Sequence, residues 1–200
     1  MSKNGVSTNP MSAIPKSKLL HVADRAGWRA WLRNNRTSKS EVWLVYHKKH
    51  TGKPRISYND AVEEALCFGW IDSTVKTIDG DRYAQRFSVR KPGSRYSQAN
   101  LERIRALAGK GRVMPDILKT IPESAVGGFE VPPDILKAIR AEKQAWKNFR
   151  RFSPSYVRIR IAFIEGARRR PAEFEKRLAH FIKMTAENKQ FGFGGIDKYY

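Results

Sequence analysis

The stretch that decides the fold is ALCFGWIDSTVKTIDGDRYAQRFSVRKPGSRYSQAN, residues 65–100. It begins with the end of an apolar helix and continues through two strand-like runs joined at Asp79-Gly80. It ends with a Pro-Gly-Ser loop that opens a basic helix. This order predicts an α+β fold, in which a small antiparallel sheet packs with helices and the C-terminal half is mostly helical.

The dipeptide Asp79-Gly80 is a strong hairpin signal, because a type I′ turn needs positive φ at both central positions. A two-residue loop would pair residues 70–78 with residues 82–90. One face of this hairpin would carry Trp70, Asp72, Lys76, Tyr83, Phe87 and Val89. The other face would carry Arg82, Arg86 and Arg90 with Ser73, Val75 and Ser88. A longer loop would change the register, but the second strand alternates aromatics and arginines in either case.

Upstream of this stretch, the sequence predicts a helix, a strand and a second helix. Asp24 can cap a helix that carries Trp28 and Leu32 at helical spacing. Residues 41–48 are rich in β-branched and aromatic side chains, which predicts a third strand. Ser57 can cap the next helix. The apolar stripe of that helix is Ala61, Val62, Ala65 and Leu66.

Downstream, residues 97–189 are predicted to be mostly helical, with breaks at Gly109-Lys110-Gly111 and Val126-Gly127-Gly128. Residues 157–161 alternate like a strand, so local propensity favours β structure there. We predict a single domain over residues 19–190. A disordered basic tail at 1–18 would precede it, and a Gly-rich tail at 191–200 would follow it.

The formal net charge of +20 over 200 residues indicates an acidic partner: phosphate, nucleic acid, an acidic protein or anionic lipid. The single cysteine excludes an internal disulfide and a Cys-based zinc site. No run of 18 apolar residues occurs, so no membrane span is expected. Because the N-terminus lacks the apolar core of a signal peptide, a cytoplasmic location is expected.

The candidate ligand- or anion-binding surface is the strand-loop-helix passage that closes the opening stretch. A helix N-terminus presents free backbone N–H groups, which nearby hydroxyls and guanidiniums can complete into an anion pocket. The candidate residues are Trp70, Asp72, Arg82, Arg86, Arg90, Lys91, Ser94, Arg95, Ser97 and Asn100. In the alternative interpretation, Ser97 is an ordinary N-cap, Gly93 is a turn residue and the arginines form a solvated sheet face.

Other chemistry-bearing residues give weaker signals. Asp72 is expected to be partly buried and to pair with an arginine or lysine of the neighbouring strand, either as a structural ion pair or within a pocket. Cys67 is expected to be a small buried residue. The four histidines lack metal-ligand spacing, and no Walker, Gly-x-Ser-x-Gly or His-Glu-x-x-His motif occurs. We therefore assign no catalytic residue, no cofactor and no metal.

Three stretches resemble the YdeI/OmpD-associated family, also called OmdA-like or bacteriocin-protection proteins. They are residues 64–72, Arg82-Tyr83 with Arg86-Phe87, and Pro92-Gly93-Ser94 with Ser97 and Asn100. The resemblance extends over about residues 22–178. It implies an α+β protein linked to stress, to resistance against bacteriocins and to association with an outer-membrane porin, with no established catalytic residues. It also implies that residues 157–161 are helical.

Three functions remain open from the sequence. The first is a non-enzymatic stress-response or bacteriocin-protection protein that binds an acidic ligand or partner through the passage at residues 70–100. The second is a sequence-nonspecific nucleic-acid binder, since residues 140–190 carry 14 Lys/Arg against 5 Asp/Glu. The third is an enzyme for a small anionic substrate, with Asp72 and the arginines converging in one cleft. Convergence would favour the first or third function, and a continuous basic face would favour the second.

Overall fold

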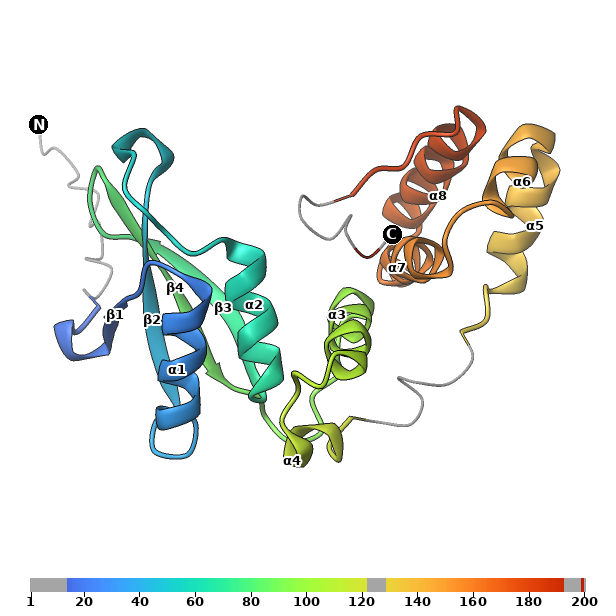
Figure 1. Ribbon diagram of the computed structural model, residues 1–200. Helices are drawn as coiled ribbons and strands as arrows, with labels where there is room; N and C mark the ends of the chain where they lie inside the picture. The colour runs from blue at the N-terminus through green and yellow to red at the C-terminus, as the bar shows by residue number, and fades with distance from the viewer. Residues whose placement is uncertain (1–13, 122–128, 193–198, 200) are drawn as a thin grey trace, which may run out of the picture. The chain divides into compact units, whose positions relative to one another are not determined.

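The computed structural model describes residues 14–121, 129–192 and 199. The chain forms two compact units, Met1–Lys91 and Pro92–Tyr200 (Figure 1). Strands occur in the first unit and helices in both, which confirms the α+β prediction and its helical C-terminal half. The predicted break at 126–128 and most of both predicted tails lie outside the described residues.

In its described residues, the first unit contains a four-stranded sheet and two α-helices. Its elements are η1 (Lys16–Lys18), β1 (Leu19–His21), α1 (Arg25–Asn35), β2 (Glu41–His47), η2 (Lys49–Thr51), α2 (Tyr58–Cys67), β3 (Trp70–Thr77) and β4 (Arg82–Val89). The strand order is β1-β2-β4-β3. Strand β1 runs parallel to β2, whereas the other two pairs are antiparallel. The hairpin and the strand near 41–48 are confirmed, and β1 is an addition to them.

The hairpin has a three-residue turn and a bulge, which correct part of the predicted register. Ile78 and Asp79 both donate their N–H groups to the carbonyl oxygen of Arg82 (3.0 and 3.2 Å). Near the turn, Lys76 pairs with Ala84, and beyond a bulge between Asp72 and Val75 the pairing becomes Asp72 with Phe87. Because a one-residue shift reverses the side-chain faces, Lys76 lies on the face with Arg86 and Val75 on the other. The faces predicted for Trp70, Asp72 and Phe87 are confirmed.

Helices α1 and α2 cover one face of this sheet (Figure 1). Trp28 on α1 is fully buried, stacks on Trp31 and lies 5.3 Å from the Phe87 ring. Its Nε1–H donates to the carbonyl oxygen of Ala61 on α2 (2.9 Å), so the indole joins both helices to the sheet. Burying one such aromatic side chain stabilises the fold by about 2–3 kcal/mol.

The second unit is helical in its described part. Its helices are α3 (Gln98–Gly109), α4 (Pro115–Leu118), α5 (Pro133–Ala141), α6 (Lys143–Phe149), α7 (Pro154–Glu165) and α8 (Pro171–Ala186). The core around α5 to α8 includes Ile139, Phe149, Tyr156, Ile161 and Phe181. The aromatic residues Phe149, Tyr156 and Phe181 are therefore core residues.

Helix α7 settles the conflict at residues 157–161. The prediction of β structure from local propensity is wrong there, and the helix implied by the family resemblance is confirmed. The Ser153 hydroxyl caps the helix by accepting from the Tyr156 N–H (3.3 Å), and Pro154 occupies its first turn. Ile161 and Ile164 then reach the apolar core. Capping and tertiary burial together outweigh the alternating local pattern.

Among the described residues, no helix has both the length and the apolar character that crossing a bilayer requires. The caps predicted at Asp24, Ser57 and Ser97 are confirmed. Asp24 accepts from the Gly27 N–H (2.8 Å), and Ser57 accepts from the Asp60 N–H (3.1 Å). Ser97 accepts from the Asn100 N–H (3.3 Å) at the start of α3.

Candidate functional site

Two arginines of β4 are already held by carboxylates. Arg82 donates its Nε and Nη2 hydrogens to Asp79 (2.9 and 2.6 Å). Arg86 donates its Nε hydrogen to Glu41 on β2 (2.6 Å), which also accepts from Lys18 (2.5 Å). Hydrogen bonds from Lys18 and Arg86 hold the pKa of Glu41 below its usual value. Both arginines thus have their charge offset by a neighbouring carboxylate in the first unit.

The other predicted site residues lie in the core, in the loop after β4 or at the start of α3. Trp70 is fully buried and contacts Trp31 edge-on, with ring centroids 5.7 Å apart. The Arg90 N–H donates to the carbonyl oxygen of Gly69 (3.0 Å). Asn100 accepts from Arg103 (3.0 Å). Lys91, Ser94, Arg95 and Ser97 are exposed. The residues through Lys91 belong to the first unit and those from Ser94 to the second, and each unit is described separately.

Asp72 does not converge with the arginines of β4. It pairs with Phe87 across the hairpin, on the face covered by the helices, whereas Arg86 projects from the opposite face. Its Oδ2 accepts from the Tyr58 hydroxyl (2.9 Å) and from Gln85 Nε2 (2.8 Å). Within the described part of the chain, Asp72 has no Lys or Arg partner, so the predicted ion pair is wrong. The strand alternation that separates Asp72 from the arginines is the reason.

Other tyrosines lie near the Asp72 carboxylate. Tyr46 is 1% exposed and stacks on Tyr83, with ring centroids 5.0 Å apart and an interplanar angle of 4°. Burial raises the pKa of the Tyr46 phenol, and nearby Tyr83, Asp72 and Tyr58 add to the effect. The Tyr46 hydroxyl is buried without a hydrogen-bond partner among the described residues. We call Tyr46, Tyr58, Asp72, Tyr83 and Gln85 the Asp72 cluster.

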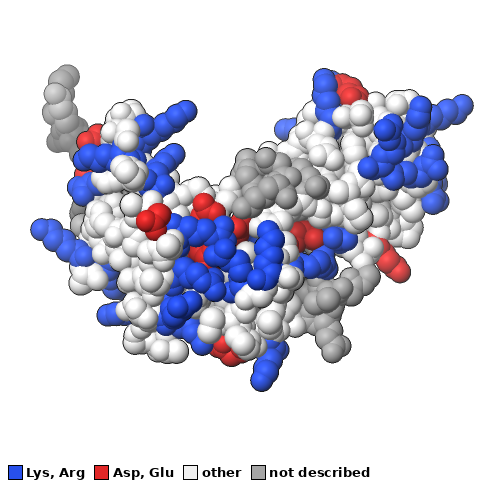
Figure 2. All heavy atoms as spheres, viewed as in Figure 1, with Lys and Arg blue, Asp and Glu red and all other residues white. Residues whose placement is uncertain are grey.

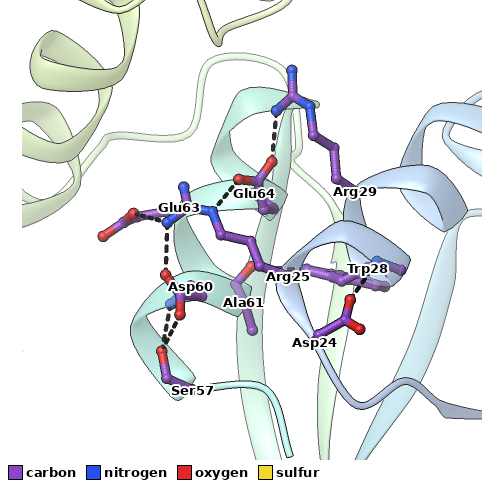
Figure 3. A network of polar contacts seen from close by, with 10 residues as sticks. Asp24, Arg25, Trp28, Arg29, Ser57, Asp60, Ala61, Glu63 and Glu64 are labelled. Carbon is purple, nitrogen blue, oxygen red and sulfur yellow. Dashed lines mark hydrogen bonds and ion pairs between the residues drawn. The ribbon is translucent and has the colours of Figure 1, made fainter.

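The sequence reasoning missed a network of buried carboxylates on α2 (Figure 3). Glu63 and Glu64 have side chains that are 2% and 0% exposed. Arg25 donates to Glu64 (2.5 Å), Glu63 (3.0 Å) and Asp60 (2.6 Å). Arg29 donates to the second oxygen of Glu64 (2.6 Å). Two glutamates inside the apolar run Ala61 to Leu66 were the signal available in the sequence.

This network holds α1 against α2 through charges that are largely shielded from water. Burial would lower the pKa of Arg25, but its hydrogen bond to Glu64 and the charges of Glu64, Glu63 and Asp60 raise it instead. Arg29 also lies 5.1 Å from the Phe68 ring centroid. Cys67, at the end of α2, is fully buried, which agrees with its interpretation as a small core residue.

A basic surface covers α5 and α6 in the second unit (Figure 2). Trp146 is half-buried, and the guanidiniums of Arg140 and Arg150 lie 4.9 and 5.4 Å from its ring centroid. Lys143, Lys147 and Arg151 are exposed alongside. Among the residues that the structure places, these five cations form no ion pair. We call these six residues the Trp146 surface.

The acidic residues around α5 and α6 have other roles. Glu142 caps α6 by accepting from the N–H groups of Gln144 (3.2 Å) and Ala145. Asp134 binds Arg168, which holds the pKa of Asp134 below its usual value. The positive charge of the Trp146 surface therefore remains available to a partner.

A buried carboxylate joins α3 to α7. Glu102, 4% exposed, accepts two hydrogen bonds from Arg158 (2.7 and 2.8 Å) and further ones from Arg105 (2.9 Å) and Gln98 (2.8 Å). Burial alone would raise the pKa of Glu102, but the hydrogen bonds from Arg158 and Gln98 lower it. The arrangement stabilises the packing of the two helices.

Two hollows accompany these clusters, and neither contains a predicted site residue. A cavity of about 120 Å³ lies between α7 and α8, lined by Phe163, Ile164, Phe181 and Phe191 with charged groups such as Arg160 and Arg177. A second, of about 180 Å³, lies beside His21 and His47 in the first unit. Among the described residues, no group of three or more His, Cys, Asp or Glu side chains could hold a metal ion.

The protein thus has an α+β fold with structural ion pairs, the basic Trp146 surface and the Asp72 cluster. Residues 20–120 match the family model described as a domain of unknown function, DUF8412. This match covers half of the chain, so the protein belongs to that family. Residues 128–188 match a second model, OmdA, described as bacteriocin-protection, YdeI or OmpD-associated. No curated protein and no solved structure matches the chain.

The resemblance to the bacteriocin-protection family is confirmed for one region, residues 128–188. That region contains α5 to α8 and the Trp146 surface. The three stretches on which the resemblance was noted lie between residues 64 and 100, inside the match to the domain of unknown function. The OmdA match therefore suggests a bacteriocin-protection or stress-response type of role.

Proposed function

We propose that the protein is a non-enzymatic binding protein of the bacteriocin-protection or stress-response type. It binds an acidic partner through the Trp146 surface. The observation that carries this proposal is a set of five cations around a half-buried tryptophan that form no ion pair with any described residue. The surface lies within the OmdA match.

Net charge alone does not identify the Trp146 surface as the binding surface. Residues 1–91 carry 17 Lys/Arg against 8 Asp/Glu, and residues 92–200 carry 22 against 11. Both units are thus basic, and pairing decides which cations are available. Arg82 and Arg86, the centre of the surface proposed from sequence, are engaged by Asp79 and Glu41. An arginine already paired gains less from an acidic partner, because the existing contact must first be lost.

A nucleic acid is the second candidate partner. An aromatic ring flanked by cations can stack on an unpaired base while the cations contact phosphates. Trp146 meets this description, with Arg140 and Arg150 close to its ring. The enzyme alternative has less support, because the register places Asp72 and Arg86 on opposite faces of the sheet.

The proposal is tested with a fluorescent poly-glutamate and a fluorescent single-stranded oligonucleotide of equal charge, titrated at low and physiological salt. We expect salt-sensitive binding of the acidic probe. Arg140→Gln/Arg150→Gln should weaken binding about tenfold and reduce the slope of log affinity against log salt by about 1.4 for the oligonucleotide. Trp146→Ala should also weaken binding of the oligonucleotide, because the variant cannot stack on an unpaired base.

The matched control is Arg169→Gln/Arg170→Gln, which removes the same charge from exposed residues outside the Trp146 surface. It should leave affinity within about twofold. An equal loss in both double variants would show that general charge, and not this surface, binds the partner. Much tighter binding of the oligonucleotide than of poly-glutamate would favour the second candidate, and absence of binding to both probes would overturn the proposal.

A further inference from the structure

Asp72 is unusual among the acidic residues of the first unit. Lys18 and Arg86 bind Glu41, Arg25 and Arg29 bind the carboxylates of α2, Arg82 binds Asp79, and His50 contacts Asp81. Asp24 caps α1. Asp72 is half-buried and accepts hydrogen bonds from Tyr58 and Gln85, both neutral, at a single oxygen. Within the described chain, its Oδ1 therefore remains available as an acceptor.

The backbone at Asp72 is also irregular. The hairpin register shifts between Asp72 and Val75. A bulge of this kind re-aims the neighbouring side chains and commonly lies next to a binding site. Here it ends the regular pairing directly after Asp72, at the edge strand of the sheet.

Three of the five residues of the Asp72 cluster are tyrosines. Tyr58 is 45% exposed, although its hydroxyl is fixed by Asp72, so its ring presents a surface to solvent beside the carboxylate. Tyr46 and Tyr83 stack on each other nearby, and the buried Tyr46 hydroxyl has no hydrogen-bond partner in the described part of the chain. Aromatic faces beside a carboxylate attract a cation and repel an anion.

We infer that the Asp72 cluster is a binding site for a guanidinium group, such as an arginine side chain of a peptide partner. A guanidinium is planar and carries several N–H donors, so it can lie against the Tyr58 ring while donating to Asp72 Oδ1. This site is independent of the acidic partner proposed above, and it takes a ligand of opposite charge.

Arg55 is a cation near this site. Arg55 is exposed, and its charge acts on the Tyr46 phenol. It donates to the carbonyl oxygen of His47 (3.1 Å) and not to Asp72. Because like charges repel, Arg55→Gln should tighten binding of a guanidinium about two- to threefold. A loss of affinity in this variant would contradict a cation site.

The test follows the Gln85 side-chain amide and the Asp72 backbone amide by two-dimensional ¹H–¹⁵N NMR of the full chain. The probe is N-acetyl-arginine amide, with N-acetyl-citrulline amide as the neutral analogue of the same shape. We expect saturable shifts with the arginine probe and none with citrulline. Asp72→Asn should weaken binding at least about tenfold, whereas Asp81→Asn, an exposed residue with the same change of charge, should not.

Two further probes define the ligand. N-acetyl-lysine amide should bind more weakly, because an ammonium cannot extend along the ring as a planar group does. Equal binding of the lysine probe would overturn the assignment to a guanidinium. The peptide acetyl-Gly-Arg-Gly-amide should bind more tightly than the single residue if the source is a peptide, and equal affinity would point to a free small molecule. Absence of saturable shifts, or unchanged binding in Asp72→Asn, would overturn the site itself.

Discussion

Replacing Glu64 with glutamine is expected to lower the free energy of unfolding of the first unit by about 3 kcal/mol. The Glu64 side chain is fully buried and accepts from Arg25 and Arg29. Glutamine has nearly the same shape, but it removes the negative charge that offsets two guanidiniums, which are 28% and 22% exposed. Arg25 keeps its contacts with Asp60 and Glu63, but the two guanidiniums are less compensated without the Glu64 charge, which is unfavourable in a buried network.

The measurement is urea unfolding followed by tryptophan fluorescence. Four of the five tryptophans, Trp28, Trp31, Trp43 and Trp70, lie in the first unit, so the signal reports mainly on it. Asp81→Asn is the control, because Asp81 is exposed and its contact with His50 should contribute less than about 0.5 kcal/mol. An equal effect of the two substitutions would show that the buried network does not stabilise the unit.

The substitution Arg25→Lys tests whether the stability of the network depends on charge alone or also on the geometry of the guanidinium. Arg25 contacts three carboxylates through the fork of its guanidinium (Figure 3). Lysine keeps the charge but cannot present the same donors, so we expect about half of the loss seen for Glu64→Gln. Full stability in this variant would mean that net charge alone holds α1 against α2.

Glu102→Gln is expected to have the second largest effect, a loss of about 2–3 kcal/mol in the second unit. Glu102 is buried and accepts a two-point contact from Arg158 on α7. Without its charge, the contact between α3 and α7 weakens. Hydrogen exchange of the α3 and α7 amides should therefore accelerate in the variant, while exchange in the first-unit sheet stays the same.

The same substitution predicts a pH dependence. The pKa of Glu102 is lowered in the folded chain, so its contribution is complete above the unfolded value of about 4.3. It is lost as the pH falls through the lower folded value, because protonation removes the charge that Arg158 binds. The stability difference between the native chain and Glu102→Gln should thus be constant above about pH 5.5 and shrink below about pH 4. A constant difference down to pH 2 would contradict this role of the ionised carboxylate.

These ion pairs also explain why the candidate site was only partly predictable. Arg82, Arg86 and Asp72 were predicted from the sequence as residues of a ligand-binding surface. Their actual neighbours depend on register and on distant residues: Glu41 lies 45 positions from Arg86. The basic Trp146 surface was visible only as composition, since nothing in the sequence distinguishes the half-buried Trp146 from the buried Phe149.

The sequence by itself determined the elements whose signals are local. Asp24, Ser57, Ser97 and Ser153 cap helices because their side chains accept from N–H groups three residues further on. The hairpin follows from the turn residues and the alternation around them.

The tertiary structure decided what depends on long-range contacts and on small shifts. A one-residue bulge moved Lys76 to the face with Arg86. Packing of α1 on α2 buried Glu63 and Glu64 with two arginines, and packing of α7 on α3 joined residues 56 positions apart, Glu102 and Arg158. Capping and turn formation act over a few residues, whereas burial and charge pairing are fixed only when distant segments come together.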